Sequence, residues 1–270
     1  MLAIEKKRMT ADSLPGAKTE ISKRSETLGS LAKGLAILEV FSISHQRLSI
    51  SEASRLTDTS PATARRCLRT LEQLGFVAFD GKYYRLTPRL SRLASAYTDL
   101  PLPSLARPHL DAARDATGKS VSLAVLEDNF SVFIARSEVD VVVTAAVKVG
   151  SRLPAPLSST GRVLLASMED NFVLESIDRL AIQHPIPFHP VPDRHEIMAA
   201  IEKVREDGFA HLVDIQNVVR TIAVPVVDVR GITHAAMSIV AFASQSSLEG
   251  LRDKDLPVLL RQASELGNKL

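Results

Sequence analysis

Apolar side chains recur every three or four positions near the start of the chain. Over residues 28–41 this spacing predicts an amphipathic helix, with Ser30 as its cap. Its buried face is expected to carry Leu31, Leu35, Leu38 and Phe41. A helix in this position would support the elements that follow it.

Two shorter helices are predicted between residues 49 and 74. The first begins at Ser49 or Ser51 and ends at the polar run 57–59, whose side chains compete for backbone hydrogen bonds. The second begins at Ser60, which precedes a proline, and ends at Gly75. Its expected buried stripe is Ala64, Cys67, Leu68, Leu71 and Leu74. Two short helices around a three-residue turn predict a helix-turn-helix.

A β-hairpin is predicted directly after the second helix. Residues 76–79 and 82–86 alternate around Asp80-Gly81, a dipeptide typical of tight hairpin turns. The combination predicts a winged helix-turn-helix.

The polar face of the second helix has an order that suits DNA. Small residues come first and arginines follow, so that the backbone can approach base edges while guanidinium groups bind guanine or phosphate. An alternative is a solvated basic helix face beside a small hairpin. The candidate DNA-binding residues are Ser49, Ser60, Ala62, Thr63, Arg65, Arg66, Arg69, Lys82 and Arg85.

Charge is distributed unevenly along the chain. Residues 28–95 contain ten Lys and Arg against five Asp and Glu, whereas residues 96–270 contain 17 against 22. This asymmetry indicates that the basic part binds a polyanion and that the acidic part has another task. The length of 270 residues also favours two domains.

Proline and composition suggest the domain limits. Residues 1–26 have no periodicity and predict a mobile tail. A linker helix is expected to begin at Pro88 and to end near Asp99, because Pro101 and Pro103 cannot continue it. The predicted units are the tail 1–26, the winged helix-turn-helix 27–87, the linker helix 88–102 and a second domain 103–270.

The second domain mixes helical and alternating patterns. This mixture predicts an α+β fold with one antiparallel sheet. Turns are expected at Asp128-Asn129 and Arg230-Gly231, and a kink or restart at Pro257. The predicted strands are 120–127, 131–136, 139–147, 221–228 and 234–242, and the predicted helices are 104–117, 160–168, 169–179, 193–207 (ended by Gly208) and 247–270.

Two stretches of the second domain carry candidate chemistry. In residues 152–161 an arginine and several hydroxyls precede an apolar helix, and a helix N-terminus with such neighbours favours a carboxylate or phosphate. Ordinary capping by Ser158 or Ser159 is the alternative. In the second stretch Arg220 begins an apolar strand, where it binds a ligand or is simply solvated.

Several other classes of protein find little support. The chain lacks G-x-S-x-G, G-x-x-x-x-G-K-[ST], G-x-G-x-x-G and H-E-x-x-H, so we expect no enzyme and no cofactor. His184, His189 and His195 match no standard zinc spacing, and no metal site is predicted. Cys67 is expected to be a structural thiol. No apolar run is long enough for a membrane span, and a cytoplasmic protein without a secretion signal is expected.

Five segments together resemble the isocitrate lyase regulator (IclR) family of bacterial transcription factors, in the family's order from residue 28 to the C-terminus. They are SLAKGLAILEVF, LSISEASRLT with SPATARRCLRTLEQLGFV, YRLTPRLSRLA, GSRLPAPLSSTGRVLLA and RTIAVPVVDVRG. Within the family the chain is most similar to the subgroup that controls protocatechuate and 4-hydroxybenzoate catabolism.

This resemblance implies a winged helix-turn-helix, a linker helix and a GAF-like domain that binds a small organic acid. It also implies dimers or tetramers on double-stranded operator DNA. The implied ligand-binding residues are Arg152, Leu153, Pro154, Ser158, Ser159, Thr160, Gly161, Asp214, Arg220, Thr221, Ile222, Ala223 and Ser238.

Two departures from the family pattern affect the implied pocket. The stretch 214–219 lacks the glycine that usually precedes the R-S-I-A motif, and Ser158 stands where relatives often carry Ala-Thr. Because both departures lie in the implied pocket, the effector of the relatives is not transferred to this chain. From the subgroup alone, the expected effector is an aromatic-catabolism acid such as protocatechuate, 4-hydroxybenzoate or β-ketoadipate, with glyoxylate or pyruvate as alternatives. A metabolic enzyme with a DNA-binding head and an architectural DNA-binding protein are the alternatives from other classes.

Overall fold

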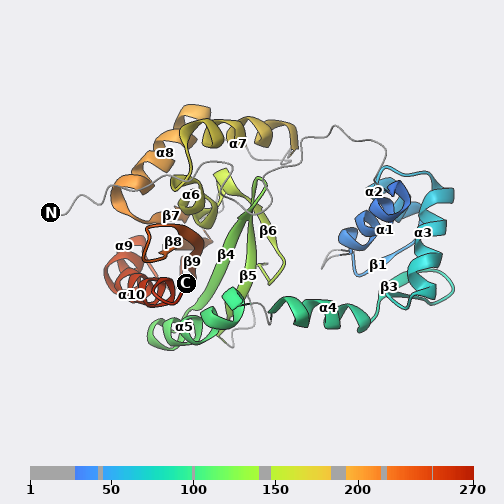
Figure 1. The fold of residues 1–270 in the computed structure, drawn as a ribbon, viewed down its shortest axis with the longest axis horizontal. Helices are drawn as coiled ribbons and strands as arrows, with labels where there is room; N and C mark the ends of the chain where they lie inside the picture. The colour runs from blue at the N-terminus through green and yellow to red at the C-terminus, as the bar shows by residue number, and fades with distance from the viewer. Residues whose placement is uncertain are drawn as a thin grey trace. The chain divides into compact units, whose positions relative to one another are not determined.

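The described residues form two compact units, which divide between Asp99 and Leu100 (Figure 1). The computed structural model describes residues 28–41, 45–98, 101–139, 147–183, 193–213, 218–244 and 246–270. We call residues 28–98 the N-terminal unit and residues 101–270 the C-terminal unit. The predicted tail lies outside the described residues.

The N-terminal unit combines helices with a small antiparallel sheet. Its helices are α1 (Gly29–Val40), α2 (Ile50–Leu56), α3 (Pro61–Gln73) and α4 (Arg89–Thr98). Its strands β1 (Arg47–Leu48), β2 (Val77–Phe79) and β3 (Tyr84–Leu86) pair in the order β1-β3-β2. The predicted winged helix-turn-helix is confirmed, and β1 is a strand that the sequence pattern did not indicate.

Local capping explains where α2 and α3 begin and end. Ser49 forms a capping box with Glu52 at the start of α2. At the start of α3, the Ser60 hydroxyl accepts a hydrogen bond from the Thr63 amide, and Pro61 is the first helical residue. Gly75 has a φ of 76°, which a residue with a side chain rarely adopts. Of the two candidate caps for α2, the structure selects Ser49.

Two details of the N-terminal unit differ from expectation. Helix α1 is capped by Leu28 without a side-chain hydrogen bond, so the predicted cap at Ser30 is wrong. The predicted face of α1 is confirmed at Leu38 and Phe41, which pack against the core, and is wrong at Leu31 and Leu35, which are 58% and 50% exposed. The helix is rotated so that Ile37, Leu38 and Phe41 contact the core.

The hydrophobic core of this unit is formed by α1, α2, α3 and the wing. Leu74 was predicted to be buried with the stripe of α3. It lies just after the last residue of α3 and is 50% exposed, so the prediction is wrong at this position. The hairpin loop is longer than predicted and spans residues 80–83, where the Asp80 carboxylate accepts hydrogen bonds from the amides of Lys82 and Tyr83. The buried core residues are Ile37, Ala53, Ala64, Leu68, Leu71, Val77 and Tyr84.

The helix α5 (Pro101–Thr117) begins earlier than the sequence predicted. Pro101 and Pro103 lie in its first turn, where an amide has no acceptor within the helix and a missing donor costs little. Pro101 and Pro103 therefore belong to the start of α5, whereas the sequence predicted that they lie between two helices.

The C-terminal unit is built on a six-stranded antiparallel sheet in the order β6-β5-β4-β9-β8-β7. The prediction of one antiparallel sheet in an α+β fold is confirmed. The short edge strands β6 and β7 were not predicted, and most of the expected strand 139–147 lies outside the described residues. The strands are β4 (Ser120–Glu127), β5 (Phe130–Ser137), β6 (Arg152–Pro154), β7 (Ala210–Val213), β8 (Val219–Val227) and β9 (Thr233–Phe242).

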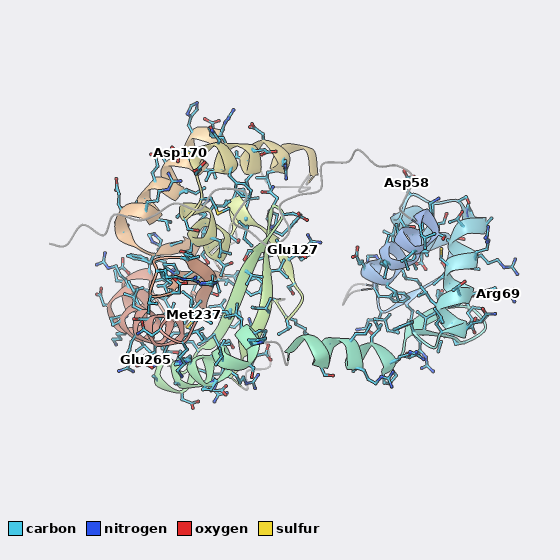
Figure 2. The ribbon with its side chains drawn as sticks, viewed as in Figure 1. Asp58, Arg69, Glu127, Asp170, Met237 and Glu265 are labelled. Atoms are coloured by element: carbon cyan, nitrogen blue, oxygen red, sulfur yellow. The ribbon has the colours of Figure 1, made fainter. Side chains whose placement is uncertain are left out.

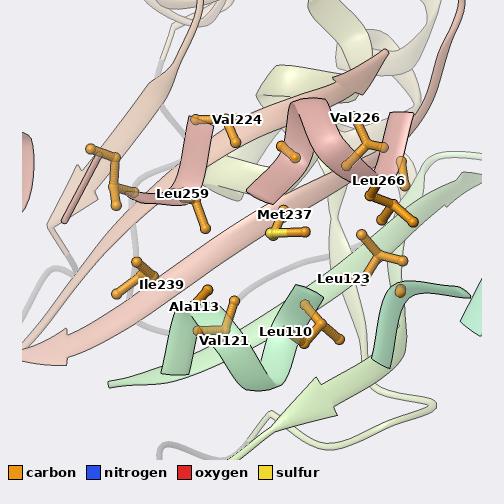
Figure 3. Packing of buried hydrophobic residues seen from close by; sticks show 14 of the residues in the cluster. Leu110, Ala113, Val121, Leu123, Val224, Val226, Met237, Ile239, Leu259 and Leu266 are labelled. Carbon is orange, nitrogen blue, oxygen red and sulfur yellow. The ribbon is translucent and has the colours of Figure 1, made fainter. Parts of the chain in front are cut away.

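Helices cover both sides of this sheet, and the two sides are named here by the helices on them. On the α5 face, Leu110 of α5 and Leu259 of α10 pack against β4, β8 and β9 (Figure 3). On the α6 face, Val163 and Leu164 pack against Ala223 and Ala236. The remaining helical segments are the 3₁₀ turn η2 (Ala155–Leu157), α6 (Ser159–Ala166), α7 (Asp170–Gln183), α8 (Arg194–Asp207), α9 (Leu248–Gly250), the π-helical η3 (Leu251–Asp255) and α10 (Leu256–Gly267).

Strand β5 contains a β-bulge opposite the middle of β4. Leu123 pairs with Ala135 and Ala124 pairs with Phe133, so Ile134 is an additional residue in β5. Because successive side chains of a strand point to opposite sides, the bulge reverses the alternation along the rest of β5. Both Ile134 and Ala135 belong to the core on the α5 face.

Candidate nucleic-acid and ligand sites

The outer face of α3 carries the first group of predicted residues. Ala62, Arg65, Arg66 and Arg69 are exposed. Thr63 is half-buried, and its hydroxyl lies 2.9 Å from that of Ser60. Figure 2 shows Arg69 on the side of α3 away from α1 and α2. The N-terminal turn of α3 therefore presents small side chains, and the next two turns present three cations.

The wing adds a second basic surface, which includes a residue that the sequence did not reveal. Arg85 is opposite Arg47 in the pairing of β3 with β1, and both are exposed. The Lys82 ammonium lies 5.2 Å and the Arg47 guanidinium 5.9 Å from the centre of the Tyr83 ring. Arg47 was missed because a two-residue strand has too little alternation to be recognised.

Within the described residues, the cations of α3 and the wing form no ion pair with a carboxylate. In the part of the chain that the structure describes, no ion pair involves Arg47, Arg65, Arg66, Arg69, Lys82 or Arg85. Hydrogen bonds from the Tyr83 and Lys82 amides direct the Asp80 carboxylate into the hairpin loop, and together with the nearby charges of Arg47 and Arg85 they lower its pKa. The arrangement leaves positive charge on the surface for an external anion.

Ser49 has a structural task at the start of α2. Its hydroxyl donates to Glu52 Oε2 at 2.7 Å and accepts from the Glu52 amide at 3.2 Å. Hydrogen bonds from Ser49 lower the pKa of the Glu52 carboxyl. Ser49 therefore fixes the start of α2, and its hydroxyl is engaged within the protein.

The start of α6 gathers the hydroxyls predicted in the second domain. Ser158, Ser159 and Thr160 are 7%, 5% and 2% exposed. The Ser158 hydroxyl accepts from the Gly161 amide at 3.1 Å, which confirms that Ser158 caps the helix. Thr160 Oγ1 lies 2.6 Å from Ser131 Oγ and ties α6 to β5.

Gly161 is required by the close approach of η2. A Cβ added to Gly161 would lie 2.2 Å from the carbonyl oxygen and 2.3 Å from the Cα of Ala155. The backbone of Ala155 cannot move without displacing η2. This packing explains the glycine independently of any ligand.

The strand residues divide between the two faces of the sheet. Ala223 belongs to the cluster under α6, and the pairing of β8 with β9 places Ser238 beside it. Strand alternation adds Thr221 to the α6 face. Leu153 lies there too, because it pairs with Ser131, which contacts Thr160.

Arg152, Pro154, Arg220 and Ile222 lie on the opposite, α5 face. Arg152 pairs with Val132, stacks on Phe130 at 4.5 Å and is 3.9 Å from Glu127 Oε2. The expectation that Arg152 shares a surface with Thr160 is therefore wrong, because the two residues lie on different sides of the strands. Asp214 lies outside the described residues.

Arg220 is engaged with the chain beyond β9. Its Nη1 donates to the carbonyls of Ala243 at 3.4 Å and Ser246 at 2.5 Å. It is opposite Ala241, which belongs to the core on the α5 face. The prediction that Arg220 and Thr160 hold one ligand between them is therefore wrong in its geometry.

Two other arginines lie near the hydroxyl groups and were not singled out from the sequence. Arg136 of β5 is 8% exposed and donates from Nη1 to Ser122 Oγ at 3.0 Å, on the α6 face. Arg162 of α6 donates from Nε to the Pro156 carbonyl at 2.9 Å, and burial lowers the pKa of its guanidinium. The signal for Arg136 was hidden because the bulge interrupts the alternation of β5.

Metal and membrane sites receive no support from the described residues. Among them no group of three or more His, Cys, Asp and Glu side chains is placed to bind a metal ion. His195 lies on α8, whereas His184 and His189 are outside the described residues. No helix in the described part of the chain is long and apolar enough to cross a bilayer.

Comparison with known proteins decides the family. Residues 30–81 match the IclR helix-turn-helix domain, and residues 94–267 match the C-terminal domain of the bacterial transcriptional regulator IclR. The chain belongs to the IclR family of bacterial transcriptional regulators. The family resemblance inferred from the sequence motifs is thereby confirmed.

Similar IclR-family proteins include two curated regulators. The Pca regulon regulatory protein of Pseudomonas putida is 34% identical over 89% of this chain and 84% of its own length. The p-hydroxybenzoate hydroxylase transcriptional activator of Acinetobacter baylyi is 32% identical over 94% of this chain and 96% of its own. A crystal structure of a transcriptional regulator from Rhodococcus sp. RHA1 is 36% identical, with a TM-score of 0.76 over 90% of this chain and 98% of that one.

Proposed function

We propose that this IclR-family regulator binds duplex operator DNA through α3 and the wing, and that a small organic acid bound to the C-terminal unit changes its DNA affinity. The observation that carries the proposal is that the two units present different functional groups. Exposed cations that form no ion pair within the described residues lie in one unit, and buried hydroxyls with a buried arginine lie in the other.

DNA recognition would use the order of side chains along α3. The turn that begins at Ser60 and includes Ala62 and Thr63 approaches base edges, while the three arginines of α3 bind guanine or phosphate. Lys82, Arg85 and Arg47 of the wing contact the neighbouring phosphates. Ser49 acts indirectly, because its hydroxyl is engaged in the cap of α2.

The effector would bind on the α6 face. The names of the two curated relatives concern the Pca regulon and p-hydroxybenzoate hydroxylase, and they favour an acid of aromatic catabolism over glyoxylate or pyruvate. The proposed contacts are Leu153, Ser158, Ser159, Thr160, Thr221, Ala223 and Ser238, a choice supported by strand pairing and by the burial of the hydroxyls at the start of α6.

The acid acts as a regulator and not as a substrate in this proposal. A ligand shifts an equilibrium only by its differential affinity for two states, so the acid must bind the DNA-competent and DNA-incompetent states unequally. A homodimer or homotetramer would couple two such chains on repeated or palindromic DNA half-sites.

A binding experiment tests both parts of the proposal. A preferred duplex is first selected from randomised DNA by the purified protein, and its affinity is measured by fluorescence anisotropy against a scrambled duplex. The titration is repeated with 4-hydroxybenzoate, protocatechuate, β-ketoadipate, glyoxylate and pyruvate. We expect sequence-dependent binding that changes with an aromatic acid, and the same acid should raise the melting temperature.

Each part has its own contrary outcome. Equal affinity for selected and scrambled duplex would overturn specific DNA recognition. A response to glyoxylate or pyruvate alone would replace the aromatic acid by a keto acid. No response in affinity or melting temperature to any acid would overturn the effector part and leave DNA recognition standing.

A further inference from the structure

One row of paired residues crosses the sheet of the C-terminal unit on its α6 face. Arg136 of β5 pairs with Ser122 of β4, Ser122 pairs with Ser238 of β9, and Ser238 pairs with Ala223 of β8. Directly paired residues have their Cβ atoms about 5 Å apart on the same side of the sheet. The row therefore places a guanidinium and two hydroxyls next to one another.

Arg136 is a buried cation whose donors are only partly used. Its side chain is 5% exposed, and its Nε donates to Glu138 Oε1 at 2.6 Å. Its Nη1 donates to Ser122 Oγ at 3.0 Å, and among the described residues its Nη2 has no hydrogen-bond partner. A guanidinium presents five donors in a planar fork that matches a carboxylate, so the remaining donors fit an anion.

Ser238 supplies a second donor beside Arg136. It is 8% exposed, and no hydrogen bond of its hydroxyl is formed with any residue that the structure describes. Among the described residues the fully buried side-chain donor without a partner is Arg220 Nε, so the unpaired Ser238 hydroxyl keeps some accessible surface and is open to a ligand. A carboxylate oxygen above the row would satisfy both groups.

The other strand arginines are excluded from this role by their side of the sheet. Arg152 and Arg220 lie on the α5 face, where Arg152 stacks on Phe130 and Arg220 donates to the Ala243 and Ser246 carbonyls. Arg136 is thus the arginine of the sheet that shares a face with Ser238 and Thr160 in the described part of the chain.

The same face changes from polar to apolar and back along the strands. Beyond the row come Ala124 and its partner Phe133, and then Ser131, whose hydroxyl contacts Thr160. From Ser122 to Leu126, the partner of Ser131, is four residues or about 13 Å along β4. Polar groups at both ends of a short apolar stretch suit a planar ring with a carboxylate on one side and a second polar group on the other.

We infer that Arg136, with the hydroxyls of Ser238 and Ser122, forms the carboxylate subsite for a one-ring aromatic acid. This inference rests on the proposed function and adds to it the residue that recognises the acid group. Ser131 and Thr160 lie where they would contact the ring substituent opposite the carboxylate.

The test compares an acid with its neutral amide. Isothermal titration of 4-hydroxybenzoate and 4-hydroxybenzamide is carried out on wild-type protein, Arg136→Gln and the matched control Arg152→Gln. We expect Arg136→Gln to weaken binding of the acid about tenfold to hundredfold and to abolish the preference for acid over amide. Arg152→Gln should keep the affinity and the preference of the wild type.

A second variant keeps the inference testable if Arg136→Gln does not fold. Ser238→Ala removes one buried hydroxyl that makes no hydrogen bond within the described structure, and it should reduce the preference for acid over amide severalfold. If Arg136→Gln fails to fold, the test rests on Ser238→Ala. An unchanged preference for acid over amide in Ser238→Ala then overturns the inference. Wild-type affinity and preference in a folded Arg136→Gln overturn it directly.

The outcomes separate this inference from the function on which it rests. If the wild type binds neither 4-hydroxybenzoate nor any other acid of the panel, the effector part of the proposed function has failed. If the wild type binds the acid and only Arg152→Gln weakens it, the function stands and the carboxylate subsite has been assigned to the wrong arginine.

Discussion

The two units place their candidate functional groups in opposite ways. In the N-terminal unit the arginines of α3 are exposed and contribute little to the core, which is formed by Ala64, Leu68 and Leu71 on the other face of the same helix. In the C-terminal unit the candidate groups are buried between the sheet and its helices. Substitutions should therefore separate function from stability in the first unit and affect both in the second.

The largest effect on stability is expected at Gly161 of the C-terminal unit. The added Cβ of Gly161→Ala would overlap the backbone of Ala155, and relieving this overlap should cost about 3 kcal/mol of unfolding free energy. Thermal unfolding should show a fall in melting temperature of roughly 6–12 °C. The control is Gly34→Ala in α1, where no atom lies within 4 Å of the new Cβ and the change should not destabilise. Equal melting temperatures for wild type and Gly161→Ala would contradict the contact.

The opposite behaviour is expected for α3 of the N-terminal unit. Arg66→Ala and Arg69→Ala should each weaken binding to the selected duplex by about 1–3 kcal/mol where the guanidinium contacts guanine. The melting temperature should stay within a degree or two of the wild type, because both side chains are exposed. Arg92→Ala, in exposed α4, serves as the control in the anisotropy titration. Unchanged affinity in both α3 variants would mean that another face of the unit binds DNA.

A smaller effect is expected at Arg220, whose substitution tests whether the α5 face of the sheet takes part in ligand binding. Arg220→Gln removes hydrogen bonds to the Ala243 and Ser246 carbonyls and should lower the unfolding free energy by about 1 kcal/mol. Affinity for the aromatic acid should remain that of the wild type. Scanning calorimetry measures the stability and titration calorimetry the affinity for the acid. A variant with unchanged stability and lost affinity would show that Arg220 belongs to the ligand site.

A pH-dependent effect on stability is expected at Asp228, in the turn between β8 and β9. Hydrogen bonds from His234, Arg230 and the Ile232 amide hold the pKa of Asp228 well below its usual range, against the opposing effect of burial. The ionised carboxylate therefore stabilises the fold above about pH 4, the ordinary Asp pKa, and this contribution is lost as the pH falls further. Asp228→Asn should melt below the wild type at pH 7 and approach it at lower pH. Asp253→Asn, at a carboxylate that is 64% exposed, is the control for the melting curves.

Local signals account for what the sequence predicted well. The helix-turn-helix was predictable because its limits are set by residues next to them in the chain, such as the Ser60 cap, Pro61 and Gly75. The helix α8 with its C-terminal Gly208 follows the same rule. Part of the buried face of α1 was mispredicted because packing, and not the spacing of apolar residues, selected it. The start of α5 was mispredicted because proline starts a helix as readily as it ends one.

The candidate ligand site was less predictable because it depends on which side of the sheet each residue occupies. Thr160 was singled out from the hydroxyls that precede an apolar helix, and Ser238 from the family resemblance. Their contacts with Ser131 and Ala223 put both on the α6 face. Arg152 and Arg220 were named with them, yet strand pairing puts both on the other face. Without knowledge of register, a sequence does not tell on which side an arginine at the start of a strand will lie.

The bulge at Ile134 decides which side chain stands over the serines of the sheet. If β5 paired regularly with β4 and kept Ile134 in the ladder opposite Leu123, Ala135 would lie opposite Ser122 and Arg136 would turn toward α5. Deletion of Ile134 would instead leave Ala135 opposite Leu123 and Arg136 opposite Ser122, because the bulge holds the one residue that the ladder does not use. A one-residue slip of this strand would therefore exchange a cation for a methyl group beside the serines, whereas loss of the bulged residue itself would keep the cation in place.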